Sequence, residues 1–230
     1  LRVLPTFAVT LGLWAVWAVG SMGAYDPNTT LHASQKLLMK KCLPVRADFT
    51  SHGRVSNVWD KGSAALVEIE VSSEYFDATY TIFVPGGGGF NGERGTSASR
   101  QAPEGDGYEA TLDTTPTQAL LYRLTGDRHP VHVDPEAARG AGLQGPILHG
   151  MCLLGAVMLT AARTIGRDPT QLLSVDARMT AVVYPGAACR VLVWPQGSAF
   201  HYRASVDDVA VISGWARFDE PLREAPMLSA

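Results

Sequence analysis

The chain has 230 residues, of which 46% are hydrophobic and 18% are charged, and its formal net charge is -3. This composition is typical of a folded globular protein with enough apolar residues for a core, in one large domain or two small ones. The slightly negative charge excludes a chain-wide basic surface of the kind that binds nucleic acid.

The cysteines predict neither a disulfide framework nor a zinc site. The three of them, Cys42, Cys152 and Cys189, are far apart and show no C-x-x-C spacing. Buried free thiols of this kind are typical of a reducing compartment, so we expect a cytoplasmic protein.

The first apolar segment has no charged residue between Val3 and Tyr25. That length is enough for a membrane span, and the small residues at 20–24 also fit a secretory signal. Pro5, Gly12 and Gly20 interrupt the segment, and no basic cluster flanks it. These features favour a buried helix over residues 6–20. Trp14 and Trp17 fit the core of that helix, or the lining of a substrate tunnel.

A β-rich stretch follows, in which valine and isoleucine alternate with glutamate over residues 67–71. Such alternation indicates a sheet with one buried and one hydrated face. The turn residues at 60–62 predict a hairpin. We predict strands over residues 35–43, 48–58, 64–72 and 79–84.

Residues 85–100 contain a run of four glycines. No GK[ST] sequence follows it, so we interpret the stretch as a connector rather than a phosphate-binding loop.

A second unit repeats the order of an apolar helix followed by strands. Thr115 and Gln118 predict a capping box, Asp134 precedes Pro135 as a helix start, and a long apolar helix is expected over residues 146–165. We predict short helices over residues 115–124 and 136–139, and strands over residues 175–183, 189–194, 200–206 and 209–218. The repeated order suggests one helix wrapped by an antiparallel sheet, made twice.

Asp127 and His132 are candidates for an acid/base pair. Asp127 follows the end of a predicted helix, and Pro130 fixes the backbone before His132. Histidine titrates near neutral pH, and a partly buried aspartate can be tuned towards it. A capping aspartate and a structural loop histidine explain the local spacing equally well.

Gly150 is a candidate oxyanion donor at the start of the long helix. The first backbone N–H groups of a helix have no internal acceptor, and glycine lets a carbonyl oxygen approach closely. Close helix packing is the alternative reason for a glycine there. The spacing of His129, His132 and His149 matches no zinc motif, and no G-x-S-x-G occurs, so neither a metal site nor a serine hydrolase is indicated.

The stretch YRLTGDRHPVHVDPEAARGAGLQGPILHG (122–150) resembles the R-specific enoyl-CoA hydratase 2 (MaoC-like dehydratase) family. The pattern of that family is Y-R-L-[ST]-G-D-x-N-P-x-H-x-D, then A-x-x-x-G, then P-I-L-H-G. The segments VLPTF (3–7), LHASQ (31–35), DKG (60–62) and GGF (88–90) resemble the first half of its double hot-dog members. In such proteins the chain usually begins upstream of VLPTF, so the first half is expected to lack its opening strand and helix here.

The resemblance implies an α+β double hot-dog fold, with two helices each wrapped by antiparallel sheet and the two sheets continuous. It divides the chain into a first half with the acyl-tail pocket (1–90), a linker (91–114) and a catalytic half (115–230). It implies reversible hydration of trans-2-enoyl-CoA to (3R)-3-hydroxyacyl-CoA, the reaction of a hydro-lyase in fatty acid metabolism. No metal or redox cofactor is expected, and the partners are an acyl-CoA or carrier-protein thioester and a second copy in a homodimer or larger homo-oligomer.

By position, the resemblance makes Asp127 and His132 the catalytic pair, Gly150 the oxyanion donor, and Tyr122 and His129 substrate-positioning residues. His129 replaces the asparagine of the family, which helps to position the reacting groups. A histidine can donate a similar hydrogen bond, but it is bulkier and can become charged. A thioesterase of the same fold, or a non-catalytic partner that binds acyl thioesters, remains open. His149 is interpreted as structural, and Arg128 as solvated or structural.

Overall fold

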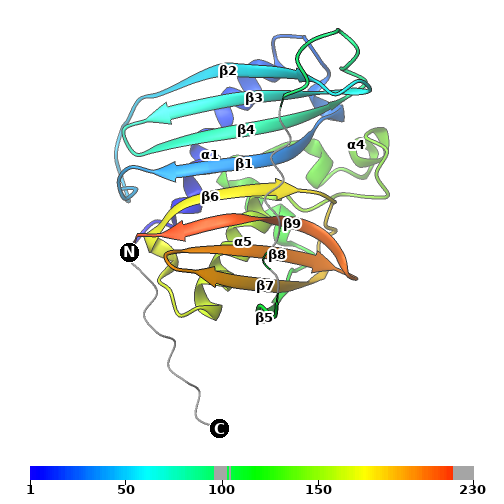
Figure 1. The fold of residues 1–230 in the computed structure, drawn as a ribbon. Coiled ribbons are helices and arrows are strands. Elements are labelled where there is room, and N and C mark those ends of the chain that lie inside the picture. Colours follow the sequence, from blue (N-terminus) through cyan, green and yellow to red (C-terminus); the bar gives the residue numbers. More distant parts are fainter. Residues whose placement is uncertain (96–102, 104, 220–230) are drawn as a thin grey trace.

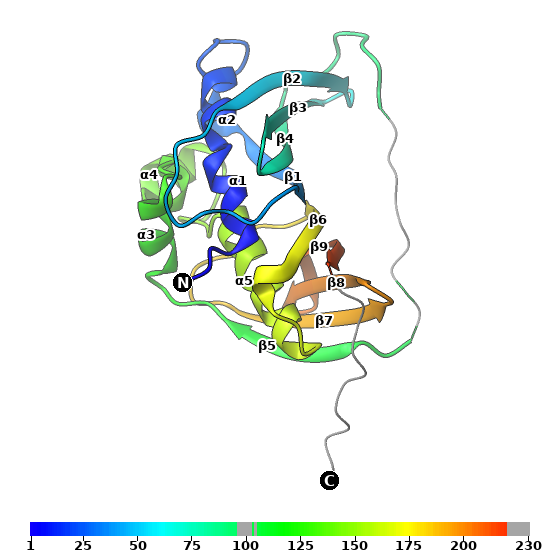
Figure 2. The ribbon, with the colours of Figure 1, turned by 90° about the vertical axis from the view of Figure 1, so that its left-hand side faces the viewer.

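The computed structural model describes residues 1–95, 103 and 105–219. The nine strands in this part of the chain form one antiparallel sheet in the order β2-β3-β4-β1-β6-β9-β8-β7-β5. The sheet curves around two helical segments that lie on the same side of it (Figures 1 and 2). This arrangement confirms the predicted α+β fold with two wrapped helices and one continuous sheet.

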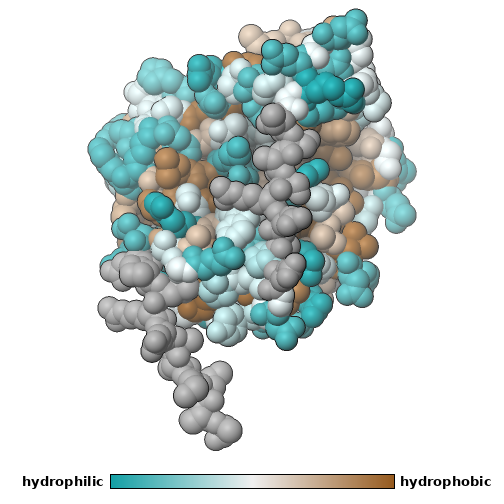
Figure 3. All heavy atoms as spheres, in the orientation of Figure 1, coloured by the Kyte–Doolittle hydropathy of each residue, from teal (hydrophilic) through white to brown (hydrophobic). Residues whose placement is uncertain are grey.

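The described part of the first half contains two short 3-10 helices, two α-helical segments and four strands. Its elements are η1 (Pro5–Phe7), α1 (Ala8–Leu11), α2 (Leu13–Gly20), η2 (Pro27–Thr29), β1 (Leu31–Met39), β2 (Ser51–Asp60), β3 (Ala64–Ser73) and β4 (Phe76–Pro85). Val67, Ile69 and Val71 are buried beneath the helices, as their alternation predicts. The outer face of the sheet carries hydrophilic and hydrophobic side chains side by side (Figure 3).

The expected single helix over residues 6–20 is interrupted at Gly12. The hydroxyl of Tyr80, on β4, donates a 2.6 Å hydrogen bond to the carbonyl oxygen of Val9. A Cβ atom at position 12 would lie 2.4 Å from that hydroxyl. Tyr80 therefore occupies the space beside the helix at the point where α1 ends, and only glycine fits there.

Trp14 and Trp17 do not lie in the core, so that interpretation is wrong. They are 45% and 40% exposed, and the Trp14 indole donates to the Ser51 hydroxyl over 3.0 Å. Cys42 is exposed too, whereas Cys152 and Cys189 are buried as predicted. No helix in the described residues is long and apolar enough to cross a membrane.

The second half repeats the plan and adds an edge strand. Its elements are β5 (Tyr108–Asp113), α3 (Gln118–Tyr122), η3 (Arg123–Thr125), η4 (Pro130–His132), α4 (Pro135–Gly140), α5 (Gly150–Thr164), η5 (Pro169–Gln171), β6 (Leu172–Met179), β7 (Ala188–Gln196), β8 (Ala199–Val206) and β9 (Val209–Phe218). Half of the predicted capping box is present, because the Gln118 side chain accepts from the Thr115 N–H over 3.1 Å. The Gln118 N–H bonds to the backbone carbonyl of Thr115 instead of its hydroxyl, and the helix begins after Thr117. The long helix begins later than predicted, since residues 146–149 are extended and the Leu148 N–H donates to Val183.

Strand β5 lies inside the stretch that the sequence indicated as linker. It pairs with β7 from Tyr108↔Val193 to Asp113↔Ala188. The rest of that stretch falls partly on residues 96–102 and 104, which lie outside the described residues.

The halves join through β1 and β6, which pair from Ser34↔Arg178 to Leu38↔Ser174. One core cluster runs through both halves and includes Val9, Tyr80, Leu154 and Tyr202. The shared core places the loops before α5 directly against the helical segments of the first half.

Candidate active site

Asp127 lies at the end of η3, immediately after a glycine. Gly126 has φ of 132°, a conformation that favours glycine and turns the chain sharply. Asp127 is only 7% exposed, and its Oδ1 accepts the His129 N–H over 3.2 Å. A backbone N–H of the turn therefore fixes one carboxylate oxygen, and the other oxygen can take part in proton transfer.

His132 ends the short helix η4, which Pro130 begins. Its Nδ1 lies 2.9 Å from the carbonyl oxygen of Ile147, in the extended segment before α5. A carbonyl oxygen can only accept, so Nδ1 carries the proton and Nε2 keeps its lone pair. Burial, and then the neighbouring His149, lower the pKa of His132 to about 4. His132 is thus a neutral base at physiological pH.

His149 lies directly against His132, which the sequence did not indicate. The two rings stack with centroids 3.7 Å apart and planes at 23°. His149 is fully buried, and its Nε2 lies 3.2 Å from the carbonyl oxygen of Asp127. In the sequence, the only sign of a role for His149 was its position next to Gly150. The stacking could not be predicted, because its partner His132 lies 17 positions earlier in the chain.

Gly150 is the first residue of α5, with His149 as the N-cap. Its N–H belongs to the first turn, where a helix offers no internal acceptor and carries a positive partial charge. A Cβ atom at position 150 would lie 3.5 Å from Cγ and Cε of Met179, which is ordinary van der Waals contact. Packing against protein alone would therefore permit alanine here, so close packing does not explain the glycine.

Tyr122 connects the site to the first half. Its hydroxyl lies 3.1 Å from the hydroxyl of Thr10 on α1, and its ring centroid is 4.9 Å from that of His149. Burial raises the pKa of Tyr122 to about 12, so its hydroxyl stays protonated and can donate.

Both ring nitrogens of His129 already have backbone partners. Nδ1 accepts the Val131 N–H over 3.2 Å, and Nε2 lies 3.0 Å from the carbonyl oxygen of Pro27. His129 therefore ties η2 of the first half to the catalytic loop. Its ring lies 5.9 Å from those of Trp17 and His132. In this conformation it can reach a substrate through its ring face and not through a nitrogen. Arg128 is exposed, as expected.

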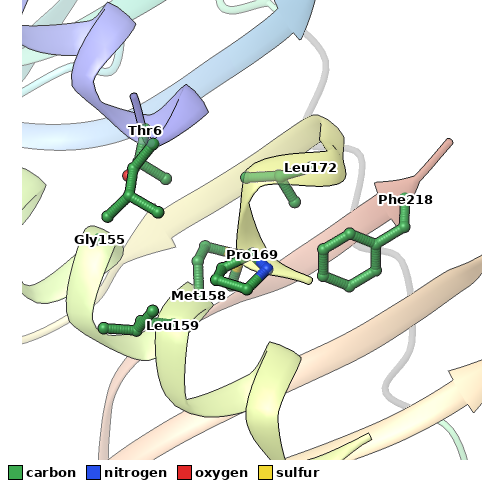
Figure 4. Close-up of a pocket in the computed structure, with 8 residues that line it drawn as sticks. Thr6, Gly155, Met158, Leu159, Pro169, Leu172 and Phe218 are labelled. Carbon is green, nitrogen blue, oxygen red and sulfur yellow. The ribbon is translucent and has the colours of Figure 1, made fainter. Parts of the chain in front are cut away.

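A cavity of about 400 Å³ adjoins His129 on the side of η2 and α4. Cavities of this size hold small-molecule ligands. Its walls are formed by Asp26, Asn28, Thr29, His129, Pro130, Asp134, Ala137 and Gly140. A second recess, between α5 and η1, is lined by Thr6, Gly155 and Met158 among others (Figure 4). At about 10 Å³ it has room for one water molecule and not for a substrate.

Asp127, His132 and His149 each offer a ligand atom, and these three atoms lie within 4.8 Å of one another. They are the residues of the site that could hold a metal ion. An imidazole binds a metal in the plane of its ring, along the nitrogen lone pair. Two rings stacked face to face direct their lone pairs side by side and not at one point, so coordination by both would require one ring to rotate. The arrangement fits proton transfer better than metal binding.

Both halves of the chain match known protein families. Residues 99–213 match the MaoC like domain, and residues 1–84 match the MFE-2 hydratase 2 N-terminal domain. The chain belongs to the MaoC-like hydratase 2 family. The enoyl-CoA hydratase ChsH3 of Mycobacterium tuberculosis is 36% identical over 93% of this chain and 80% of its own length.

Solved structures share the fold. Full-length peroxisomal multifunctional enzyme type 2 from Drosophila melanogaster aligns with a TM-score of 0.75 and 31% identity, over 93% of this chain and 40% of that one. A conserved Mycobacterium tuberculosis protein with a double hotdog fold aligns with a TM-score of 0.55 and 13% identity, over 94% of this chain and 82% of that one. The predicted family and the double hot-dog fold are thereby confirmed.

Proposed function

We propose that this protein adds water reversibly to a trans-2-enoyl-CoA and forms the (3R)-3-hydroxyacyl-CoA. It is a hydro-lyase of the hydratase and 3-hydroxyacyl-thioester dehydratase type. The observation that carries the proposal is the meeting of the buried Asp127 carboxylate, the half-buried neutral His132 and the start of α5 in one cluster.

The acid/base pair is suited to hold one water molecule. Water has two O–H groups to donate, and the site offers two acceptors, a carboxylate oxygen of Asp127 and Nε2 of His132. Proton transfer from this water to the pair leaves a hydroxide oxygen that bonds to Cβ of the enoyl group. The proton is then delivered to Cα from the same side, so that the net change is addition of one water.

Gly150 would stabilise the charge that develops between these two steps. As the new C–O bond forms at Cβ, the electrons of the double bond move towards the thioester carbonyl and create an enolate oxygen. The free N–H at the N-terminus of α5 can donate to that oxygen. Tyr122 fits a role in fixing the wall of the site. His129 would position the substrate through its ring face.

The cavity beside His129 is the proposed entrance for the thioester arm. Among the described residues, its lining includes the carboxylates Asp26 and Asp134 and no lysine or arginine. A cavity with this charge fits an uncharged pantetheine or acyl segment better than a phosphate. The phosphates of CoA would then remain outside it. A homodimer and a cytoplasmic location both stay predictions. The family does not determine the location, because the relative from Drosophila melanogaster is peroxisomal.

The test is turnover of short- and long-chain trans-2-enoyl-CoA, followed in parallel for loss of the enoyl chromophore and for free thiol. We expect hydration without thiol release. Thiol release would indicate a thioesterase. Thermal stabilisation by the thioester without any product would indicate a binding protein and overturn the proposal.

A further inference from the structure

The protonation of the two stacked histidines follows from their backbone partners. His149 Nε2 faces the carbonyl oxygen of Asp127, and His132 Nδ1 faces that of Ile147. Each of these nitrogens must carry a proton, because a carbonyl oxygen does not donate. The lone pairs of the neutral rings therefore lie on Nδ1 of His149 and on Nε2 of His132.

His149 is neutral at physiological pH. Its Nδ1 is buried and has no hydrogen-bond partner in the described residues. Protonation there would bury a charged N–H without an acceptor, which is costly. Burial accordingly lowers the pKa of His149. The stacking adds a second reason, since two imidazolium rings 3.7 Å apart would repel each other.

The position of His149 links every proposed catalytic group. Its Nε2–H binds the backbone of Asp127, its ring face supports His132, and its own peptide continues into the N–H of Gly150. Tyr122 packs on His149 at 4.9 Å. No other described residue touches both members of the acid/base pair and also adjoins the oxyanion donor in the chain.

We propose that His149 is a positioning residue for the hydration reaction. Its Nε2–H bond and its ring stack fix the relative positions of Asp127, His132 and the Gly150 N–H. This role rests on the proposed function and deepens it. It also replaces the purely structural role that the sequence indicated for His149.

The proposal predicts a specific change in the titration of His132. The charged or titratable groups that act on the pair are Asp127, which favours the protonated rings, and Arg123 and His129, which oppose them. His149 itself lowers the pKa of His132, because a proton on one ring disfavours a proton on the other. Removing this second imidazole should therefore raise the pKa of His132.

Two substitutions separate the two contacts. His149→Gln keeps a donor that can reach the Asp127 carbonyl and loses the ring stack, while His149→Phe keeps an aromatic ring and loses the donor. His201→Gln and His201→Phe are the matched controls. His201 on β8 is also buried, at 4% exposure, and also has an unpartnered Nδ1, but its ring lies between Trp194 and Trp215, outside the site.

For each variant, kcat and KM are measured across pH, and the imidazole nitrogens are followed by NMR. Both His149 variants should lower kcat by roughly 10- to 100-fold, as expected for small misplacement of reacting groups, with KM changed less than about threefold. Both should move the acid limb of kcat/KM and the His132 titration to higher pH. The His201 variants should do neither.

Unchanged kcat and an unmoved His132 titration in a folded His149 variant would overturn the positioning role. So would a wild-type spectrum in which Nε2 of His149 carries no proton. If one variant fails to fold, the other variant and the wild-type spectrum still test the positioning role. Failure of the proposed function would look different, since wild-type protein would show no hydration while the NMR titration still reported on the coupling of the two rings.

Discussion

Replacing Gly150 by alanine separates the catalytic role of this glycine from any structural one. A methyl group at this position would contact Met179 at 3.5 Å, which is an ordinary packing distance. Alanine is a better helix former than glycine by up to about 1 kcal/mol. The variant should therefore be as stable as the wild type or slightly more stable, with a rise in Tm of up to about 4 °C.

Activity should change in the opposite direction. Side chains of a helix point towards its N-terminus, so the new methyl group would stand beside the Gly150 N–H, where the thioester oxygen has to approach. Loss of one oxyanion donor typically lowers kcat by about 100- to 1000-fold, equivalent to roughly 3–4 kcal/mol of transition-state stabilisation. Opposite signs for stability and activity are hard to obtain from a purely structural glycine.

The assay is steady-state hydration of an enoyl-CoA alongside thermal unfolding, with Gly155→Ala as the control. Gly155 lies in the same helix, where a Cβ atom would meet the Thr6 hydroxyl at 3.6 Å (Figure 4). The control should gain similar stability and keep its kcat. Gly150→Ala with wild-type kcat/KM, or with activity lost only in proportion to folded protein, would refute the role given to the Gly150 N–H.

Three further predictions concern the acid, the pH dependence and the helix break. Asp127→Asn should keep its fold, because the amide oxygen can still accept the His129 N–H, and should lose roughly 100-fold or more in kcat; a rate within tenfold of wild type would remove the assigned pair. The folded-state pKa of His132 is about 4, below its ordinary value of 6.5, so stability should be complete above about pH 6.5 and fall by up to about 1.4 kcal/mol per pH unit towards pH 4. The free energy of unfolding, measured with urea at each pH in this range, should fall less steeply with decreasing pH in His132→Gln than in the wild type. The same pH dependence in both proteins would contradict the burial of a neutral His132. Gly12→Ala should lower the free energy of unfolding by roughly 1–3 kcal/mol, because its Cβ would displace the Tyr80 hydroxyl, and Tyr80→Phe should rescue part of that loss.

The strands and the long helix could be predicted because their patterns are local. The alternation of Val67, Ile69 and Val71 with glutamates requires only neighbouring residues, and all three are buried as predicted. Strand β5 was missed because it is an edge strand with most of its residues exposed. Only Ala110 and Leu112 turn partly inward, which is too short a pattern to identify.

Features that depend on distant residues could not be read in this way. The break at Gly12 is caused by Tyr80, 68 residues further along the chain, and the join of the two halves depends on the register between β1 and β6. Trp14 and Trp17 follow the usual spacing of a helix core, yet both are partly exposed. Their contacts lie on distant segments, since Trp14 bonds to Ser51 on β2 and the ring of Trp17 lies beside that of His129.

In the candidate site too, some features follow from the local sequence and others depend on distant residues. Asp127, His132 and Gly150 could be selected from residue type, spacing and resemblance, and the structure brings them together. The stacking of His149 on His132 and the attachment of His129 to Pro27 could not be selected, because both depend on folding that joins separate loops. The family asparagine is replaced by a residue whose nitrogens hold two backbone groups, a role that the sequence did not indicate.

The stereochemistry of hydration in heavy water tests the central claim most directly. Wild-type protein is incubated with a trans-2-enoyl-CoA in D₂O, and the configuration of the product is determined at C2 and C3. We predict the (3R)-hydroxy product of the proposed reaction. Because one acid/base pair is proposed to deliver both groups, deuterium at C2 should be added to the same face as the hydroxyl. A (3S) product, or addition of the two groups to opposite faces, would contradict it.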